Sequence, residues 1–171
     1  MSQTNLSQIR HSLAHLLAAA VKELYPDALP TIGPAVDNGF YYDFDELKIT
    51  DNDLEKIEQK MRELAKNWSN FKHQEVDEKE AKKVYKNNTY KLELIEEIVG
   101  KGEKITLYTS GEFTDLCRGG HVADFSDIDL AGFKLDRIAG AYWRGDEKNK
   151  MLTRIYGLAF ENKEKLEEYL K

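Results

Sequence analysis

Residues 6–25 read LSQIRHSLAHLLAAAVKELY, and the rest of the expected fold is arranged around this stretch. Its apolar side chains recur at steps of three and four residues, which predicts an amphipathic helix that ends at Pro26. The same stretch holds His11 and His15, whose spacing places both on one face of a helix. At about 100° per residue they lie nearly opposite the apolar stripe. We therefore expect them to face either solvent or a cleft, and not the main core.

Helices and strands follow in an order that defines the fold class. A turn at residues 37–39 precedes a strand over 40–44, and Thr50 with Asp53 resembles a capping box for a helix that extends to Trp68. The remaining expected elements are a strand over 71–76, a helix over 77–85, a helix over 91–99 closed by Gly100, strands over 105–109, 133–138, 140–144 and 151–160, a hairpin connection at 145–149 and a final helix capped by Asn162. This order predicts an α+β domain with helices packed on a mainly antiparallel sheet.

The composition fits one folded domain in a reducing compartment. The chain has 171 residues, of which 41% are hydrophobic and 33% charged, so a packed core is expected. No apolar run is long enough to span a membrane, and no secretion signal is present at the start of the sequence. A single cysteine excludes an internal disulfide. We therefore expect a cytoplasmic protein with no membrane partner.

The net charge of −6 limits how the chain could bind nucleic acid. A protein that holds nucleic acid through its backbone alone should be basic, so a role of this kind must be local or be helped by another domain. One local exception lies between residues 134 and 154, where the basic residues outnumber the acidic ones: Lys134, Arg137, Arg144, Lys148, Lys150 and Arg154. An ordinary solvated pair of strands explains this stretch equally well.

A second pair of reactive side chains lies in the motif Cys117-Arg-Gly-Gly-His121. Combined with the two helical histidines it offers three imidazoles and one thiol, a donor set that suits zinc. Four protein ligands would close the metal site and make it structural. Two alternatives remain open: a hydrolytic pocket without metal, in which histidine acts as a base, and an unrelated pair of exposed histidines with a buried cysteine.

Three further residues are candidates for a hydrolytic pocket. Lys91 opens an apolar helix and could stabilise an oxyanion or position water, although a solvated surface lysine is the commoner case. Asp115 precedes Cys117 by two residues, so on an extended segment both share a face, but it could also cap a loop. Tyr41 and Tyr42 point to opposite sides of their strand, so only one of them can line a cleft.

Several motifs agree in order and spacing with a known family. They are His11-Ser-Leu-Ala-His15, Ile32-Gly33-Pro34, Asp37-Asn38-Gly39-Phe40-Tyr41-Tyr42-Asp43, Asp115-Leu-Cys117-Arg-Gly-Gly-His121, Ala139-Gly-Ala-Tyr142-Trp143-Arg144-Gly145-Asp146 and Met151-Leu-Thr-Arg154-Ile-Tyr156-Gly157. In this combination the chain, from about residue 6 to residue 171, closely resembles the editing domain of bacterial threonyl-tRNA synthetase, which is related to alanyl-tRNA editing domains. The resemblance implies the threonyl/alanyl-tRNA synthetase editing-domain fold.

The resemblance also implies a function and a set of site residues. Such domains hydrolyse the ester of serine wrongly attached to tRNA(Thr), at the tRNA 3′ end. The matching catalytic positions are His11, His15 and Lys91, and the matching substrate-binding positions are Tyr42, Asp115, Cys117 and His121. In the alanyl branch the His/His/Cys/His set carries zinc, whereas the threonyl branch uses a water-based pocket. The motifs here belong to the threonyl branch, so we expect no required metal; if zinc is present, its ligands would be His11, His15, Cys117 and His121.

The resemblance implies partners and leaves alternatives. We expect residues 1–171 to form a single editing domain without an aminoacylation core, and its partners to be the acceptor end of tRNA(Thr) carrying serine and the rest of a synthetase, in cis or in trans. The alternatives are a zinc-binding or non-catalytic module that binds the tRNA acceptor end, and a deacylase for alanyl-tRNA. Gly120 replaces a proline that the family usually has, which puts the placement of His121 in doubt.

Overall fold

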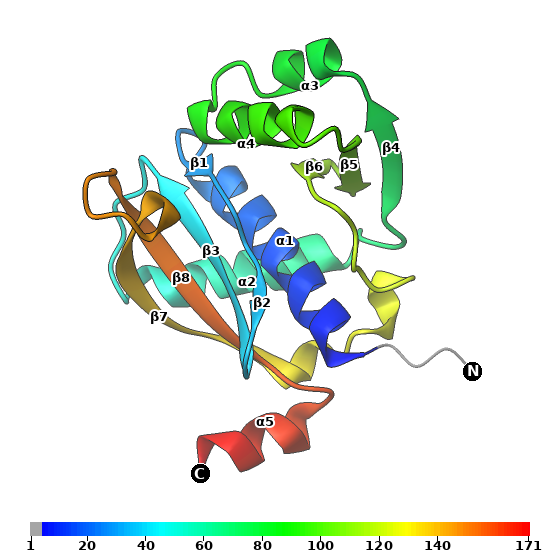
Figure 1. Cartoon of the computed structure of the whole chain (residues 1–171). Coiled ribbons are helices and arrows are strands. Elements are labelled where there is room, and N and C mark those ends of the chain that lie inside the picture. Colours follow the sequence, from blue (N-terminus) through cyan, green and yellow to red (C-terminus); the bar gives the residue numbers. More distant parts are fainter. Residues whose placement is uncertain (1–4) are drawn as a thin grey trace.

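The computed structural model describes residues 5–171, in which helix α1 (Leu6–Leu24) forms the centre of the molecule (Figure 1). The side chain of Asn5 caps the helix by accepting the N–H of Gln8. The helix ends where the sequence predicts. Its middle is buried on all sides, because residues on the apolar stripe and residues opposite it, such as Ser12 and His15, are equally inaccessible to solvent.

A five-stranded antiparallel sheet packs against one side of α1. Its strands are β1 (Leu29–Pro30), β2 (Ala35–Val36), β3 (Gly39–Asp45), β7 (Phe133–Tyr142) and β8 (Met151–Ala159). The order is β1-β3-β8-β7, and β2 also pairs with β3. Helix α2 (Asp53–Ala65) packs on α1 and on β7 behind the sheet (Figure 1). Phe40, Tyr42 and Phe44 alternate along β3 and point into the resulting large core.

A second, smaller layer covers the other side of α1. It consists of the antiparallel sheet β4 (Lys72–Val76), β5 (Ile105–Ser110) and β6 (Phe113–Leu116), with the helices α3 (Glu78–Val84) and α4 (Thr89–Gly100) above it (Figure 1). Its own core is small and contains Ala81, Ile95 and Ile105. We call this layer, residues 72–116, the small lobe. The chain ends in helix α5 (Lys163–Leu170), which Asn162 caps as predicted.

The α+β class with antiparallel pairing is confirmed, but the arrangement differs from the expectation in four respects. There are two sheets and not one, and strand β6 was not predicted because a four-residue segment shows little alternation. The strands expected over 133–138 and 140–144 form one strand, which a bulge between Leu135 and Arg137 interrupts without ending it; this strand ends at Tyr142, because Trp143–Gly145 form a short 3-10 helix. Gly100 is still helical, and the left-handed residue after α4 is Gly102.

Side chains next to the helix termini accept hydrogen bonds at the starts of α2 and α3. The predicted capping box is half formed, because the N–H of Thr50 donates to the carboxylate of Asp53 whereas Asn52 takes the cap position. Asp77 caps α3 by accepting from Glu80. Within residues 5–171 none of the helices combines the length and the apolar composition needed to cross a bilayer.

Two glycine substitutions should test the packing of the large sheet. A Cβ atom at Gly157 in β8 would lie 2.3 Å from the ring of Phe40, whereas a Cβ at Gly100 would meet nothing within 4 Å. We expect Gly157→Ala to lower the free energy of unfolding by about 1–3 kcal/mol through overpacking. The matched Gly100→Ala should raise it by about 0.5–1 kcal/mol, because alanine is the better helix former. Urea unfolding measures both, and equal effects would contradict the packing described.

Candidate active site

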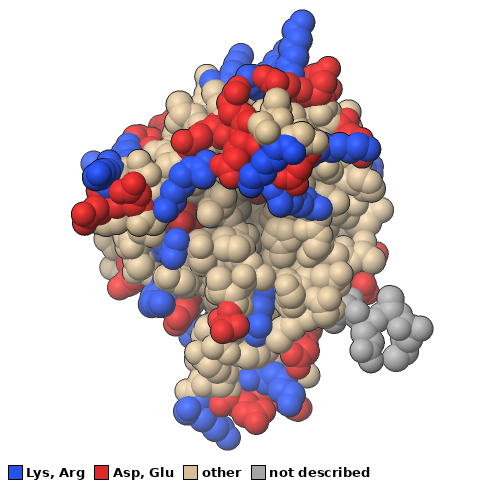
Figure 2. All heavy atoms as spheres, in the orientation of Figure 1, with Lys and Arg blue, Asp and Glu red and all other residues tan. Residues whose placement is uncertain are grey.

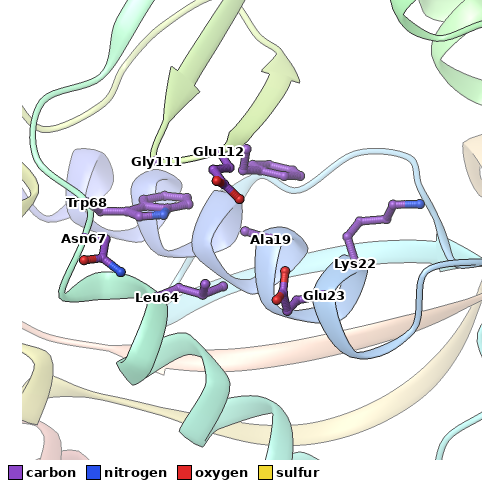
Figure 3. A pocket seen from close by; sticks show the side chains of 9 residues that line it. Ala19, Lys22, Glu23, Leu64, Asn67, Trp68, Gly111 and Glu112 are labelled. Atoms are coloured by element: carbon purple, nitrogen blue, oxygen red, sulfur yellow. The ribbon is translucent and has the colours of Figure 1, made fainter.

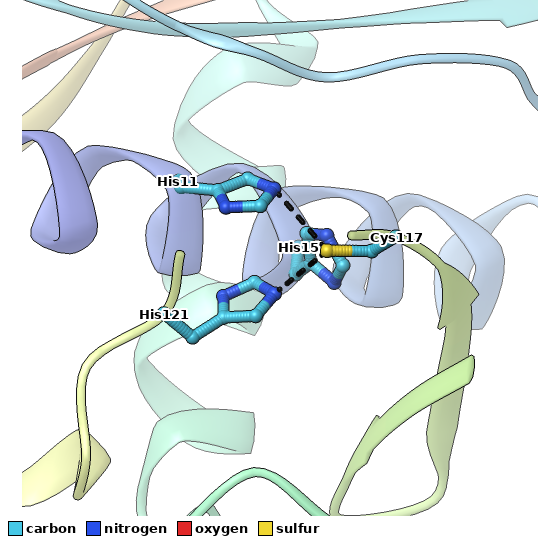
Figure 4. Close-up of side chains that lie close together, drawn as sticks. All are labelled: His11, His15, Cys117 and His121. Atoms are coloured by element: carbon cyan, nitrogen blue, oxygen red, sulfur yellow. Dashed lines mark hydrogen bonds between the residues drawn. The ribbon is translucent and has the colours of Figure 1, made fainter. Parts of the chain in front are cut away.

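Four side chains that can bind metal converge where the small lobe meets α1 (Figure 4). His11 and His15 project from α1, while Cys117 and His121 come from the loop that follows β6. The Cys117 Sγ lies 3.6 Å from His11 Nε2 and 3.3 Å from His121 Nε2, and the four donor atoms all lie within 4.8 Å of one another. The interpretation as exposed histidines and an unrelated cysteine is therefore wrong.

Two glycines let the loop return to α1. Gly119 and Gly120 have φ angles of 109° and 87°, which L side chains rarely adopt. The N–H of Gly119 donates to Cys117 Sγ at 3.1 Å, and the carbonyl of Gly120 lies 3.3 Å from His11 Nδ1. Proline, with φ fixed near −65°, could not occupy position 120 in this conformation. Glycine at position 120 thus allows a loop conformation that proline could not adopt, and this conformation still places His121 in the cluster.

Ser12 fixes the fourth member of the cluster, and the sequence analysis did not identify it. Its Oγ lies 3.1 Å from His121 Nδ1 and accepts the N–H of Val122 at 3.1 Å. The His121 ring is stacked between Phe71, at 4.0 Å, and His11, at 4.2 Å. The signal for Ser12 was present in the sequence, because a hydroxyl adjacent to His11 in a helix that is buried throughout its middle needs a partner.

A buried polar network lies beside this cluster. The Nζ of Lys91 lies 2.6 Å from Asp115 Oδ1 and donates to the hydroxyl of Tyr42 at 3.1 Å. That hydroxyl donates to Asp115 Oδ2 at 2.6 Å, and His15 Nε2 lies 3.6 Å from the same oxygen. Lys91 is 2% exposed, so the commoner case of a solvated lysine is wrong here.

Local structure explains how Lys91 becomes buried. It occupies the first turn of α4, where its N–H and that of Tyr90 are capped by the side chain of Asn88. The Asn88 amide also donates to the carbonyl of Pro30 at 2.8 Å, which holds this end of α4 against the large sheet. The contacts of Asn88 therefore fix the position of the first turn of α4, and with it the burial of the Lys91 side chain.

The site opens into a cleft of 270 Å³. Of the sequence-predicted residues, six line it: His11, His15, Tyr42, Lys91, Asp115 and Cys117. His121 is not part of its lining and contacts the cleft through Cys117. The sequence analysis assigned no role to the remaining lining residues, which are Thr31, Ile32, Gly33, Leu94, Leu116, Arg118 and Gly119. Gly33 is required there, because a Cβ would lie 2.0 Å from the Tyr42 ring.

Burial keeps the histidines of the cluster neutral. Desolvation lowers the pKa of His15 to about 3 and that of His121 to about 2, and it also lowers the pKa of His11. The contact between His15 and Asp115 is therefore not an ion pair at neutral pH. A carbonyl can only accept, so the bond to Gly120 places the His11 proton on Nδ1 and leaves Nε2 as an acceptor.

The other titratable groups respond to burial in opposite ways. Burial raises the pKa of the Cys117 thiol to about 12, and it raises the pKa of the Tyr42 hydroxyl well above its usual value. For Asp115, burial favours the neutral acid, but the charge of Lys91 and the bonds it accepts outweigh that effect and lower the pKa. The site therefore holds an ionised carboxylate next to a protonated thiol.

The spacing within the cluster partly matches what zinc requires. With bonds of about 2.0–2.1 Å to nitrogen and 2.3 Å to sulfur, a tetrahedral site needs nitrogen–sulfur separations of about 3.6 Å. The separations of Cys117 Sγ from His11 Nε2 and from His121 Nε2, 3.6 and 3.3 Å, are close to this value. The other donor atoms lie within 4.8 Å of one another, so His11, His15, Cys117 and His121 could hold such an ion after drawing closer together.

The basic stretch between residues 134 and 154 does not form a free cationic patch. Arg154 makes two bonds to Asp43, Arg144 pairs with Glu97 at 2.6 Å, and Lys150 pairs with Glu46 at 2.8 Å. On the face shown in Figure 2, lysine and arginine side chains are likewise interspersed with acidic ones. The interpretation as a solvated pair of strands therefore fits most of this stretch.

The depressed pKa of His15 should make the fold sensitive to mild acid. An unfolded histidine binds a proton near pH 6.5, whereas His15 in the fold does so only near a pKa of about 3. The unfolded state binds more protons in this window, so stability falls as the pH drops below 6.5. We expect the free energy of unfolding to fall by about 2 kcal/mol between pH 7 and pH 5 from this residue alone. Urea unfolding at these two pH values should show a smaller fall in His15→Gln, and an equal fall would contradict the assignment.

Comparison with known proteins agrees with this geometry. Residues 105–156, which include β5, β6, the cysteine loop and most of the β7–β8 hairpin, match the family described as threonyl and alanyl tRNA synthetase second additional domain. The chain is 50% identical over 171 residues to the threonine–tRNA ligase of Rubrobacter xylanophilus, which covers 99% of this chain and 26% of that protein.

Other threonine–tRNA ligases match nearly the whole chain as well. The protein of Borrelia hermsii is 52% identical over 95% of this chain and 28% of its own length, and that of Thermotoga petrophila is 49% identical over 95% and 25%. The chain thus spans about a quarter of the length of these relatives. Together with the fold, these matches identify the chain as similar to the editing domain of threonyl-tRNA synthetases: residues 105–156 match the second-additional-domain family, and nearly the whole chain matches one part of the threonine–tRNA ligases.

Proposed function

We propose that this chain is an editing module that removes serine from mischarged tRNA(Thr) by hydrolysis. One observation carries the proposal: Lys91, Asp115 and Tyr42 form a buried, hydrogen-bonded network in the same cleft as the acceptor nitrogen of His11. Such an arrangement can bind the amine of an aminoacyl ester and hold a water molecule next to its carbonyl carbon. On this proposal the chain works with the rest of a threonyl-tRNA synthetase, in cis or in trans, on charged tRNA in the cytoplasm.

A second site of this kind solves a problem of discrimination. Serine lacks one methyl group of threonine, and a pocket that binds the shared hydroxyl and amine gains only about 1–3 kcal/mol from that group. An editing cleft reverses the selection by admitting serine and excluding the extra methyl. The small volume of the cleft, 270 Å³, and the packing of Gly33 against Tyr42 support a site that distinguishes substrates by size.

We assign the amine contact to Asp115 and the activation of water to His11. Lys91 keeps Asp115 ionised, so the carboxylate can accept from the ammonium group of serine. The unprotonated Nε2 of His11 can take a proton from water as the water attacks the ester carbonyl. The C–O bond to the ribose then breaks, the ribose oxygen regains a proton, and serine leaves with a new carboxylate. Lys91, as part of this network and of the cleft lining, can also orient the ribose or the water.

The remaining residues complete the pocket. Tyr42 bridges Lys91 and Asp115, and His15 lies against the same carboxylate. Cys117 forms part of the wall, and His121 holds it from outside the cleft. A covalent role for the thiol is disfavoured, because its pKa is raised to about 12 and an aminoacyl ester is already reactive toward water.

We further propose that hydrolysis does not require metal. If zinc binds, His11, His15, Cys117 and His121 would hold it, and a four-ligand site of this kind supplies stability and not catalysis. It would also occupy the Nε2 of His11 that the water mechanism uses. The two alternatives from the sequence, a zinc-stabilised binding module for the tRNA acceptor end and a deacylase for alanyl-tRNA, are outcomes of the experiment below.

The isolated chain should release serine from Ser-tRNA(Thr) and leave Thr-tRNA(Thr) largely intact. We expect release to persist in the presence of a chelator, because the base is a histidine and the leaving group is an activated ester. Radiolabelled serine released over time measures the rate, and Ala-tRNA(Ala) tests the alternative specificity. No release from any substrate would contradict a self-sufficient hydrolase and favour a binding module, whereas loss of activity with chelator would overturn the metal-free mechanism.

Substitution of Lys91 should affect both activity and stability. We expect Lys91→Ala to slow serine release by at least about 100-fold, through loss of the charge that holds Asp115 in place. Because the carboxylate would remain buried without its partner, the variant should also lose about 3–5 kcal/mol of stability. Its activity must therefore be measured under conditions where circular dichroism shows folded protein. Lys82→Ala, which removes partly exposed ion pairs with Glu78 on α3 and with Glu96 on α4, is the control for loss of a lysine charge outside the cleft. Unchanged release by folded Lys91→Ala would contradict the role assigned to Lys91.

A further inference from the structure

Ser12 lies in the buried part of α1, and the hydrolysis proposed above uses no atom of it. The residue is 0% exposed. A serine inside a helix commonly faces solvent or bonds a carbonyl of the preceding turn. The partners of this hydroxyl lie 109 and 110 residues further along the chain: Nδ1 of His121 is 3.1 Å from Oγ, and the N–H of Val122 donates to Oγ at 3.1 Å. Ser12 therefore ties the loop after β6 to the helix.

The two bonds of Ser12 have a fixed direction. A backbone N–H can only donate, so Oγ accepts from Val122. The hydroxyl proton is buried as well, and within residues 5–171 the only acceptor that it bonds is Nδ1 of His121. The reverse bond, from an Nδ1–H to Oγ, would leave the hydroxyl proton buried without an acceptor. Nδ1 of His121 is therefore the acceptor, and the ring carries its proton on Nε2.

This tautomer makes the His121 ring a donor to the cysteine. Nε2 of His121 lies 3.3 Å from Cys117 Sγ (Figure 4), and Sγ also accepts the N–H of Gly119 at 3.1 Å. The two N–H donors hold the sulfur in the lining of the cleft. In the other tautomer, the lone pair of Nε2 would face the sulfur, and only the thiol proton could bridge the two atoms. Ser12 thus decides whether Cys117 accepts or donates on this side.

We propose that Ser12 is a positioning residue that acts through His121 on Cys117 and fixes the cleft wall that separates serine from threonine. The inference rests on the proposed editing function. Stacking of His121 on Phe71, at 4.0 Å, and on His11, at 4.2 Å, fixes the plane of the ring but not its orientation within that plane. The bond to Ser12 fixes the orientation. Since one methyl group distinguishes the two amino acids, the position of a single wall atom decides which of them fits.

The tautomer of His121 can be measured without substrate. Long-range ¹H–¹⁵N NMR of the free protein reports which ring nitrogen carries the proton, and the chain has only four histidines to assign. We expect the proton on Nε2 in the wild type and in Ser12→Thr, which keeps a hydroxyl, and a mixture of both tautomers in Ser12→Ala. A wild-type ring protonated on Nδ1, or an unchanged tautomer in Ser12→Ala, would overturn the assignment.

The ratio of serine release from Ser-tRNA(Thr) to threonine release from Thr-tRNA(Thr) tests the role in specificity. We expect Ser12→Ala to lower this ratio by up to about tenfold, through faster threonine release, and Ser12→Thr to restore it. A merely structural defect would slow both reactions and leave the ratio unchanged, which would contradict the proposal. Circular dichroism must show folded protein for each variant.

Ser110→Ala is the matched control. Ser110 is 3% exposed, and its hydroxyl has no partner in the described part of the chain. It precedes Gly111, which lines a separate pocket of 460 Å³ at the C-terminal end of α1 (Figure 3). That pocket and the cleft share no lining residue. We expect this variant to change neither the ratio nor the tautomer of His121, and a change equal to that of Ser12→Ala would overturn the proposal.

A double substitution shows whether the effect passes through His121. In a His121→Ala background, Ser12→Ala should not change the ratio any further, because the ring that connects the two side chains is absent. An undiminished effect would mean that Ser12 acts through the backbone of Val122, and the proposal would be wrong. If the wild type releases no serine, the editing function fails and the specificity role with it, whereas the NMR spectrum still decides the link between Ser12 and His121.

Discussion

A buried ion pair between Lys91 and Asp115 connects the parts of this molecule that the site depends on. Removing two charges from water costs several kcal/mol for each. The pair is therefore stable only because the remaining hydrogen-bond donors and acceptors of both groups also have partners. The Asp115 carboxylate also accepts the N–H of Leu116 and the hydroxyl of Tyr42. These contacts link α4, β6 and β3, which belong to two different layers. The pair therefore specifies how the layers meet, and its contribution to net stability is of secondary importance.

Helix α1 provides the surface on which this junction forms. Its apolar stripe belongs to the large core, while its opposite face carries His11, Ser12 and His15 toward the loop after β6. A helix that is covered on both sides can hold polar groups rigidly, because every neighbour is itself packed. The aromatic rings of Phe71 and Trp68 continue this packing outward from His121.

The sequence predicted the individual helices and strands better than the way they pack together. Periodicity and caps located α1, the Asp77-capped helix and the Asn162-capped helix within a residue or two, because these signals are local. Motif spacing and the family resemblance predicted seven candidate site residues, and the structure brings these seven together. The burial of Lys91 could not be predicted, since it depends on an Asn88 cap that contacts a distant strand. The existence of a second sheet and the contact of Ser12 with His121 depend on tertiary packing in the same way.

The unequal size of the two cores has a consequence for motion. The large core contains most of the buried apolar residues, whereas that of the small lobe contains Ala81, Ile95 and Ile105 with a few partly buried neighbours. Opening a unit costs free energy in proportion to the apolar surface it exposes, so the small lobe is the part that can separate from α1 most cheaply. Such an opening would break the Lys91–Tyr42 contact and uncover the histidines while leaving the five-stranded sheet intact. Amide exchange in this molecule should thus be organised by lobe, with the reactive side chains at the boundary between slow and fast regions.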